Sequence, residues 1–167
     1  SLQRLAEELF QGQTGSVVAI DPRNGEILAL VSMPSFDPNL FVDGISYKNY
    51  NELRDSSSRP LFNRALTGQY PPGSTTKPFF GLAGLEYSVM GHKNSVFCGG
   101  YYLLPNEERK YRAWKNTGHG KMDLEGAITQ SCDVYFYSLS YSLGIDRMSE
   151  FMQQFGFGER TGIDSTS

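Results

Sequence analysis

The spacing of apolar positions predicts a helix and a hairpin in the first part of the chain. Helical spacing near the start predicts a short amphipathic helix carried by Leu2, Leu5, Leu9 and Phe10. The apolar run 15–20 predicts a buried strand, and the run 26–33 predicts its partner. Between them, Asn24-Gly25 supplies the left-handed positions of a tight turn. The two runs therefore predict a β-hairpin, which the prolines of 34–38 end.

The rest of the chain is predicted to be mainly helical. Residues 39–72 indicate an irregular crossing with short helical pieces, and 92–122 indicate loops with short strands. A helix is predicted after Gly73, with Leu82, Leu85 and Val89 on one face and Gly91 as its stop. Further helices are predicted near 124–131, 134–143 and 146–155. A hairpin followed by helices indicates an α+β fold and not a repeating βαβ pattern.

Composition narrows the classes of protein that fit. The 167 residues suit one domain or part of one, and the net charge is -3. A weakly acidic chain lacks the basic face of a nucleic-acid binder. No apolar run approaches the roughly 18–20 residues that span a bilayer, and Ser1–Phe10 has no signal-peptide pattern. We therefore expect these residues to be soluble, with any membrane anchor lying upstream of them.

The sharpest local pattern is the segment Pro71–Pro78, which reads PPGSTTKP. If a helix starts near Ser74, then Ser74 and Lys77 lie one turn apart on the same face. A serine hydroxyl becomes a nucleophile when a base takes its proton, and a lysine can be that base. The alternative is a helix-capping serine beside a solvated lysine. The flanking prolines and glycine favour the nucleophile pair.

A second polar group follows in Ser131-Cys132-Asp133, between two predicted helices. A turn there would point Ser131 and Asp133 at one spot, where a second hydroxyl could shuttle a proton to a leaving amine. Taken alone, the segment is more typical of a helix cap, because Ser and Asp are favoured there. A catalytic role for this segment is therefore predicted only in combination with Ser74 and Lys77.

Together, the two sites resemble the penicillin-binding protein and serine β-lactamase family, whose ordered motifs are S-x-x-K and then S-x-N or S-x-D. Further segments fit the same family in the right order: 18–32, 35–41, 63–65, 111–114 and 118–120. The last two are similar to the elongation-type, rod-shape branch of class B penicillin-binding proteins. The resemblance covers nearly the whole chain. It implies the α+β penicillin-binding transpeptidase fold, with a helical region packed against an antiparallel sheet.

The resemblance also implies a role for each motif residue. Ser74 would be the acylated nucleophile, Lys77 its general base and Ser131 the proton-relay hydroxyl. Asp133 would hold the third position of the second motif, where many relatives carry Asn. An ionised Asp accepts hydrogen bonds but donates none, so it would not reproduce the contact of an Asn amide with substrate.

The third family motif, K-[ST]-G, is absent from the expected place. Lys115–Gly118 precedes the second motif and has one residue too many, while Arg160-Thr161-Gly162 follows it too closely and has Arg for Lys. Residues 1–167 are therefore expected to be part of a transpeptidase domain, truncated before the third-motif strand. That strand would supply a wall of the cleft and one oxyanion-hole amide, so this part alone is expected to be inactive.

The function that the resemblance implies is a D,D-transpeptidase of bacterial peptidoglycan. Ser74 would attack the D-Ala-D-Ala carbonyl of a stem peptide, and β-lactams would acylate the same serine. Expected partners are a lipid-linked-precursor glycosyltransferase and elongation scaffold proteins, and the expected location is the periplasm, with an inner-membrane anchor upstream. Two alternatives stay open: a β-lactamase or β-lactam sensor of the same fold, and a non-catalytic interaction module.

Three further residues are candidate metal ligands: Cys98, His119 and Cys132. Two thiols and one imidazole can hold structural zinc with one further position open, although their spacing matches no compact zinc finger. No cofactor is needed for acyl transfer itself. A metal at Cys132 would brace Ser131 from behind. Unlinked thiols remain an equal alternative, and a Cys98–Cys132 disulfide a less favoured one.

Overall fold

In the computed structural model, which describes residues 1–163, the chain divides into two compact units. The first is Ser1–Tyr70 and the second begins at Pro71. The described residues combine six α-helices with three antiparallel two-stranded sheets, so the predicted α+β class is confirmed. Both catalytic motifs predicted from the sequence lie in the second unit. None of the described helices has the length and apolar character needed to cross a bilayer.

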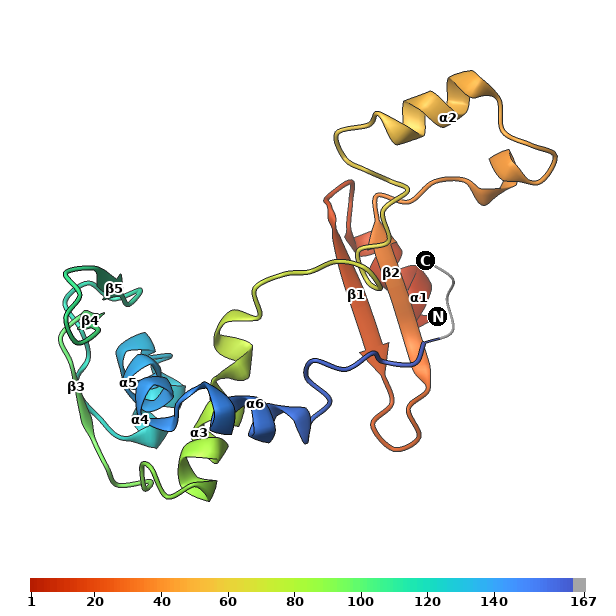
Figure 1. The fold of residues 1–167 in the computed structure, drawn as a ribbon. Helices are drawn as coiled ribbons and strands as arrows, with labels where there is room; N and C mark the ends of the chain where they lie inside the picture. Colours follow the sequence, from red (N-terminus) through yellow and green to blue (C-terminus); the bar gives the residue numbers. More distant parts are fainter. Residues whose placement is uncertain (164–167) are drawn as a thin grey trace. The chain divides into compact units, whose positions relative to one another are not determined.

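The first unit is built on the predicted hairpin (Figure 1). Strand β1 (Gly15–Ile20) pairs antiparallel with β2 (Ile27–Met33), and α1 (Leu2–Leu9) contacts β2. The prediction that β1 is buried was wrong, because Val17, Val18 and Ile20 are exposed. Alternating residues of a strand point to opposite faces. Strand β1 has apolar residues on both faces, and this pattern led to the prediction of a buried strand.

The crossing that follows β2 contains the short helical pieces predicted for it. These are the 3-10 helix η1 (Pro38–Phe41) and helix α2 (Tyr47–Arg54). Its return path is fixed by the buried Arg64, whose guanidinium donates to the carbonyl oxygens of Ser58, Arg59 and Phe62. The Arg64 backbone N–H donates to Ser32 Oγ of β2 at 2.9 Å. The crossing is thereby tied back to the hairpin.

The second unit packs four helices around one core. The 3-10 helix η2 (Gly73–Thr76) leads into α3 (Lys77–Glu86), and α4 (Leu124–Thr129), α5 (Asp133–Leu143) and α6 (Ile145–Gln153) follow later in the chain. Helix α5 contacts α3, α4 and α6. Its buried residues Tyr135, Phe136 and Leu139 form the centre of the core.

Helix α3 differs from its prediction in both its end and its buried face. It ends at Glu86 instead of near Gly91, and Leu82 and Leu85 are exposed. The residues it buries in the core are small: Gly81, Ala83 and Gly84. A Cβ at Gly84 would lie 2.7 Å from Leu139 Cδ1, so the glycine lets α5 approach α3 closely.

Between α3 and α4, two small sheets confirm the predicted loops with short strands. Strand β3 (Val96–Cys98) pairs with β6 (Gly120–Met122), and β4 (Tyr101–Leu103) pairs with β5 (Lys110–Arg112). Strands β3, β4 and β5 contact α5, on which the second motif begins. Figure 1 shows β4 and β5 beside α5 within this unit.

Candidate active site

Ser74 lies in a rigid turn at the entrance to α3. Two prolines precede the turn, and Gly73 has the positive φ of 58° that favours glycine. Thr75 Oγ1 donates to Pro72 O at 2.6 Å, and Thr76 Oγ1 donates to Gly73 O at 2.9 Å. No side-chain cap hydrogen bond is formed at this helix start, so Ser74 is not a capping serine. The Ser74 hydroxyl is therefore free to form a hydrogen bond outside the helix start.

Lys77 is the first residue of α3 and is 8% exposed. Its Nζ donates to Asp133 Oδ1 at 2.6 Å, to Ser131 Oγ at 2.9 Å and to Ser131 O at 3.0 Å. The ring of Phe136 lies 5.6 Å from the same nitrogen. The three donor positions of an ammonium group are therefore all engaged. The alternative of a solvated lysine is excluded for this structure.

Ser131 and Asp133 flank the turn between α4 and α5. Ser131 has a φ of 50°, a left-handed conformation that is uncommon outside glycine. Cys132 is the N-cap residue just before α5, without a side-chain cap hydrogen bond, and Asp133 is the first residue of the helix. The carboxylate is favoured there by the helix dipole. The two side chains meet at Lys77 instead of capping a helix.

A continuous hydrogen-bond chain joins the four predicted residues. Ser74 Oγ lies 2.8 Å from Ser131 Oγ, which lies 2.9 Å from Lys77 Nζ, and Lys77 pairs with Asp133. The Lys77 backbone N–H donates to Ser74 O, but within the described residues no hydrogen bond joins Ser74 Oγ directly to Lys77 Nζ. The predicted pair is thus linked through Ser131, which can pass a proton in either direction because a hydroxyl both donates and accepts.

A cavity of about 270 Å³ opens beside this chain of hydrogen bonds. It is lined by Gly73, Ser74, Thr76, Lys77, Phe80, Asp133, Phe136, Tyr137 and Ser140. Its lining combines the polar side chains of Ser74, Lys77 and Asp133 with the rings of Phe80, Phe136 and Tyr137. Burial, and then the negative charge of Asp133, raises the pKa of Tyr137. Its phenol therefore stays protonated at neutral pH and is available as a donor or acceptor.

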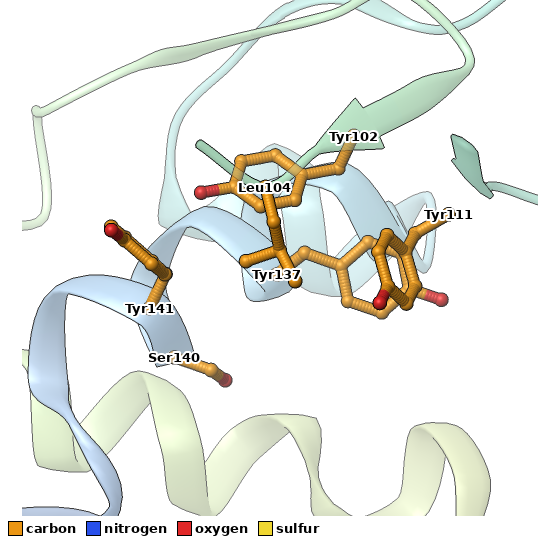
Figure 2. Close-up of a pocket in the computed structure, with 6 residues that line it drawn as sticks. All are labelled: Tyr102, Leu104, Tyr111, Tyr137, Ser140 and Tyr141. Carbon is orange, nitrogen blue, oxygen red and sulfur yellow. The ribbon is translucent and has the colours of Figure 1, made fainter. Parts of the chain in front are cut away.

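A second cavity of about 250 Å³ lies beside α5, and Figure 2 shows the residues that line it. Tyr137 and Ser140 line both cavities. The other walls of the second come from Tyr102, Leu104, Tyr111 and Tyr141. Sequence reasoning did not identify this cavity, because tyrosines from β4, β5 and α5 meet only in the folded chain. It gives the site an aromatic extension without a charged side chain.

The predicted zinc residues come together on the buried side of the second motif. One donor atom from each of Cys98, His119 and Cys132 lies within 4.8 Å of the others. Cys98 Sγ is 3.4 Å from His119 Nδ1, and both thiols are buried and free. His119 Nε2 is buried without a hydrogen-bond partner among the described residues. Burial, and then the hydrogen bond with Cys98, raises the pKa of Cys132, which keeps it a thiol.

Trp114 also contacts the second motif, a contact that the sequence did not predict. Its backbone N–H donates to Asp133 Oδ2 at 3.3 Å, and its indole Nε1 donates to Gln130 O at 3.0 Å. In the sequence, the segment 111–114 indicates only a family resemblance. The one sequence feature that could have indicated this contact is that Trp114 is the single tryptophan of the chain and lies in a predicted loop.

Comparison with known proteins agrees with this geometry. A family model described as the penicillin binding protein transpeptidase domain matches residues 15–167. The chain belongs to this transpeptidase family. Among curated relatives, the peptidoglycan D,D-transpeptidase MrdA of Acinetobacter baumannii is 52% identical over 99% of this chain and 25% of that protein. MrdA of Escherichia coli is 47% identical over 98% of this chain and 26% of that protein.

Solved structures of the family show the same fold. PBP2 of Pseudomonas aeruginosa, in complex with WCK 5153, has 56% identity and a TM-score of 0.88, covering 94% of this chain and 34% of that one. PBP2 of Helicobacter pylori, in complex with MreC, has 37% identity and a TM-score of 0.88, covering 95% and 29%. The predicted assignment to the elongation-type branch, penicillin-binding protein 2, is confirmed. The chain spans about a quarter of the curated relatives that it matches.

Proposed function

We propose that the protein containing this chain is a serine D,D-transpeptidase that cross-links bacterial peptidoglycan. The observation that carries the proposal is the hydrogen-bond chain from Ser74 through Ser131 to Lys77 and Asp133. It supplies a nucleophile, a proton path and a buried amine within one cavity. The high identity to curated peptidoglycan D,D-transpeptidases supports the same reaction.

In the first half-reaction, Ser74 Oγ attacks the carbonyl carbon of the D-Ala-D-Ala bond of a stem peptide. The Ser74 proton passes to Ser131 Oγ while the Ser131 proton passes to Lys77 Nζ, which must be a free amine at that moment. The C–N bond then breaks, and the terminal D-Ala leaves as an amine that takes the proton back along this path. An acyl-enzyme on Ser74 remains.

In the second half-reaction, the amine of a neighbouring stem peptide attacks the acyl-enzyme carbonyl. Its proton follows the same path, the ester bond to Ser74 breaks, and a new amide cross-link forms. Asp133 accepts a hydrogen bond from Lys77 throughout and fixes the direction of its amine. A β-lactam would acylate Ser74 by opening its ring amide, and its leaving amine would stay attached to the acyl group.

Labelling with a penicillin tests the nucleophile. In the full-length protein, a fluorescent penicillin is expected to attach to Ser74 alone, as mapped by peptide mass spectrometry, and Ser74→Ala is expected to abolish the label. Ser142→Ala is the matched control, because Ser142 is exposed and its hydroxyl bonds to Ser138 O on the same helix. Undiminished labelling of Ser74→Ala would remove Ser74 from the mechanism.

The setting proposed for the whole protein is the periplasm, with an anchor in the inner membrane. The expected partners are a lipid-linked-precursor glycosyltransferase and a scaffold protein of the elongation machinery. A PBP2 relative has been solved in complex with MreC, which supports a scaffold partner of that kind. Co-purification of the full-length protein with MreC from the same organism tests this part of the proposal.

For the cysteine cluster, we propose a structural zinc site formed by Cys98, His119 and Cys132. The residues fit the ion: two buried thiols and an imidazole with a partnerless nitrogen are zinc ligands by type. Ligand atoms around one tetrahedral zinc lie about 3.3–3.8 Å apart, so a spread of 4.8 Å needs only a small closure. When bound, the ion would brace the backbone behind Ser131 and take no part in acyl transfer.

Elemental analysis of the full-length protein, purified without chelator, tests the zinc site. We expect about one zinc per chain, with Cys98 and Cys132 protected from thiol reagents until EDTA is added. His119→Ala is expected to lower the zinc content, whereas the same change at His92, which is exposed and outside the cluster, is not. If wild-type protein purified without chelator contains no zinc and both of its thiols react freely, the zinc site is wrong and Cys98 and Cys132 are unlinked thiols.

A further inference from the structure

The Ser131 turn is a helix ending in which serine occupies a position that usually requires glycine. After α4, Ser131 N–H donates to Ile128 O at 3.1 Å and Cys132 N–H donates to Ala127 O at 2.8 Å. These two bonds form a Schellman ending, whose left-handed residue is usually glycine. Here that residue is Ser131, with a φ of 50°. The backbone that carries the relay hydroxyl is therefore strained and depends on its neighbours to keep its conformation.

Carbonyl oxygens at the end of a helix have no partner within the helix, and two of those in this turn are held from outside. Lys77 Nζ donates to Ser131 O at 3.0 Å. The indole Nε1 of Trp114 donates to Gln130 O, also at 3.0 Å. Gln130 O belongs to the peptide group that joins Gln130 to Ser131, so the indole fixes the peptide plane that sets the direction of Ser131.

Trp114 also holds the other side of the turn. Its backbone N–H donates to Asp133 Oδ2 at 3.3 Å, while Asp133 Oδ1 accepts from Lys77. Trp114, which lies outside the two motifs, thus contacts a residue on each side of Ser131: Gln130 before it and Asp133 after it. Trp114 is 65% exposed, and the centre of its ring lies 5.3 Å from that of the His119 ring. Its side chain therefore adds little to the core, and its hydrogen bonds are its main contribution.

We infer that Trp114 is a positioning residue that holds the Ser131 turn in the conformation needed for acylation of Ser74. The inference rests on the proposed role of Ser131 in the proton path. Without the indole donor, Gln130 O has no hydrogen-bond partner among residues 1–163, and the strained turn can relax toward conformations in which Ser131 Oγ no longer bridges Ser74 and Lys77. The covalent step should then slow, while the cavity that receives the ligand keeps its lining residues.

The test measures acylation of the full-length protein by a labelled penicillin over a range of concentrations. Trp114→Phe keeps an aromatic ring but loses the N–H donor, and Trp114→Leu loses both. Because one hydrogen bond is at stake, each variant is expected to lower the saturating acylation rate about 3- to 10-fold. The half-saturating concentration should change less than about twofold, and the melting temperature should stay near that of wild type. Phe97→Leu, at an exposed aromatic residue of β3, is the matched control and should acylate normally.

A double-mutant cycle with Ser131→Ala separates this inference from the proposed function. If Trp114 acts through Ser131, Trp114→Phe should have no further effect on acylation in the Ser131→Ala background. A Ser131→Ala variant that acylates normally would overturn both the proposed proton path and the role of Trp114. If Ser131→Ala is slow but Trp114→Phe is normal, or is altered only in half-saturation or melting temperature, the inference about Trp114 alone is wrong.

Discussion

Replacing Lys77 by methionine is expected to lower the rate of Ser74 acylation by a factor of about 10²–10⁴, the usual contribution of a positioned general base. Methionine matches the unbranched shape of lysine in its buried site but carries no amine. Ser131 Oγ would then lose the group to which it is proposed to pass its proton. Acylation of the full-length protein by a labelled penicillin, followed with time, measures the effect.

Lys77→Arg is the control that separates a base from an ion-pair partner. Arginine keeps the positive charge beside Asp133, which accepts from Lys77 at 2.6 Å in the native site. A guanidinium group does not lose its proton under these conditions, so it cannot serve as a base. Lys77→Arg is therefore expected to be nearly as slow as Lys77→Met. An arginine variant within tenfold of the wild-type rate would show that only the charge at this position matters.

The residues of the candidate site could be picked out from the sequence, but the hydrogen-bond path that joins them could not. Ser74, Lys77, Ser131 and Asp133 stand in motifs with fixed spacing, and the structure brings all four together. The sequence suggested direct contact between Ser74 and Lys77 because the two lie one turn apart. The observed link through Ser131 depends on a left-handed serine, and residue type alone does not indicate a φ of 50° there.

Contacts that depend on a distant loop were also missed. Trp114 reaches Gln130 and Asp133 only because strand pairing returns the chain to the start of α5. Each strand of this region has three residues, too few for a pattern of alternation to be read with certainty. The hairpin of the first unit was predicted well, since its turn signal and its two apolar runs are adjacent in the sequence.

The buried face of α3 was mispredicted because its packing residues are small. Leu82 and Leu85 carry a strong apolar signal but are exposed, whereas Gly81, Ala83 and Gly84 are buried. Apolar periodicity weights side chains by hydrophobicity, and glycine contributes almost nothing to it. Two helices approach each other closely where a small residue on one lies opposite a large residue on the other, as at Gly84 and Leu139.

Leu139→Ala is expected to destabilise the second unit by about 2–5 kcal/mol, the usual cost of opening a cavity in a packed core. Leu139 is 1% exposed and lies against Gly84, so the vacated space is bounded by α3 and α5. Leu82→Ala is the matched control: this leucine is 50% exposed, and its loss should cost under about 1 kcal/mol. The stability of both variants is measured by thermal and denaturant unfolding of the full-length protein, with loss of penicillin labelling as the signal of unfolding.

Adding Gly84→Ala completes the test of this helix contact. Alone, the new Cβ would meet Leu139 Cδ1 at 2.7 Å, closer than carbon atoms pack, so Gly84→Ala should also be destabilising. In the Leu139→Ala background that clash is gone, and the added methyl group fills part of the cavity. The double variant should therefore be more stable than the sum of the two single changes predicts. Strict additivity, or equal losses from Leu82→Ala and Leu139→Ala, would contradict the packing of α3 against α5.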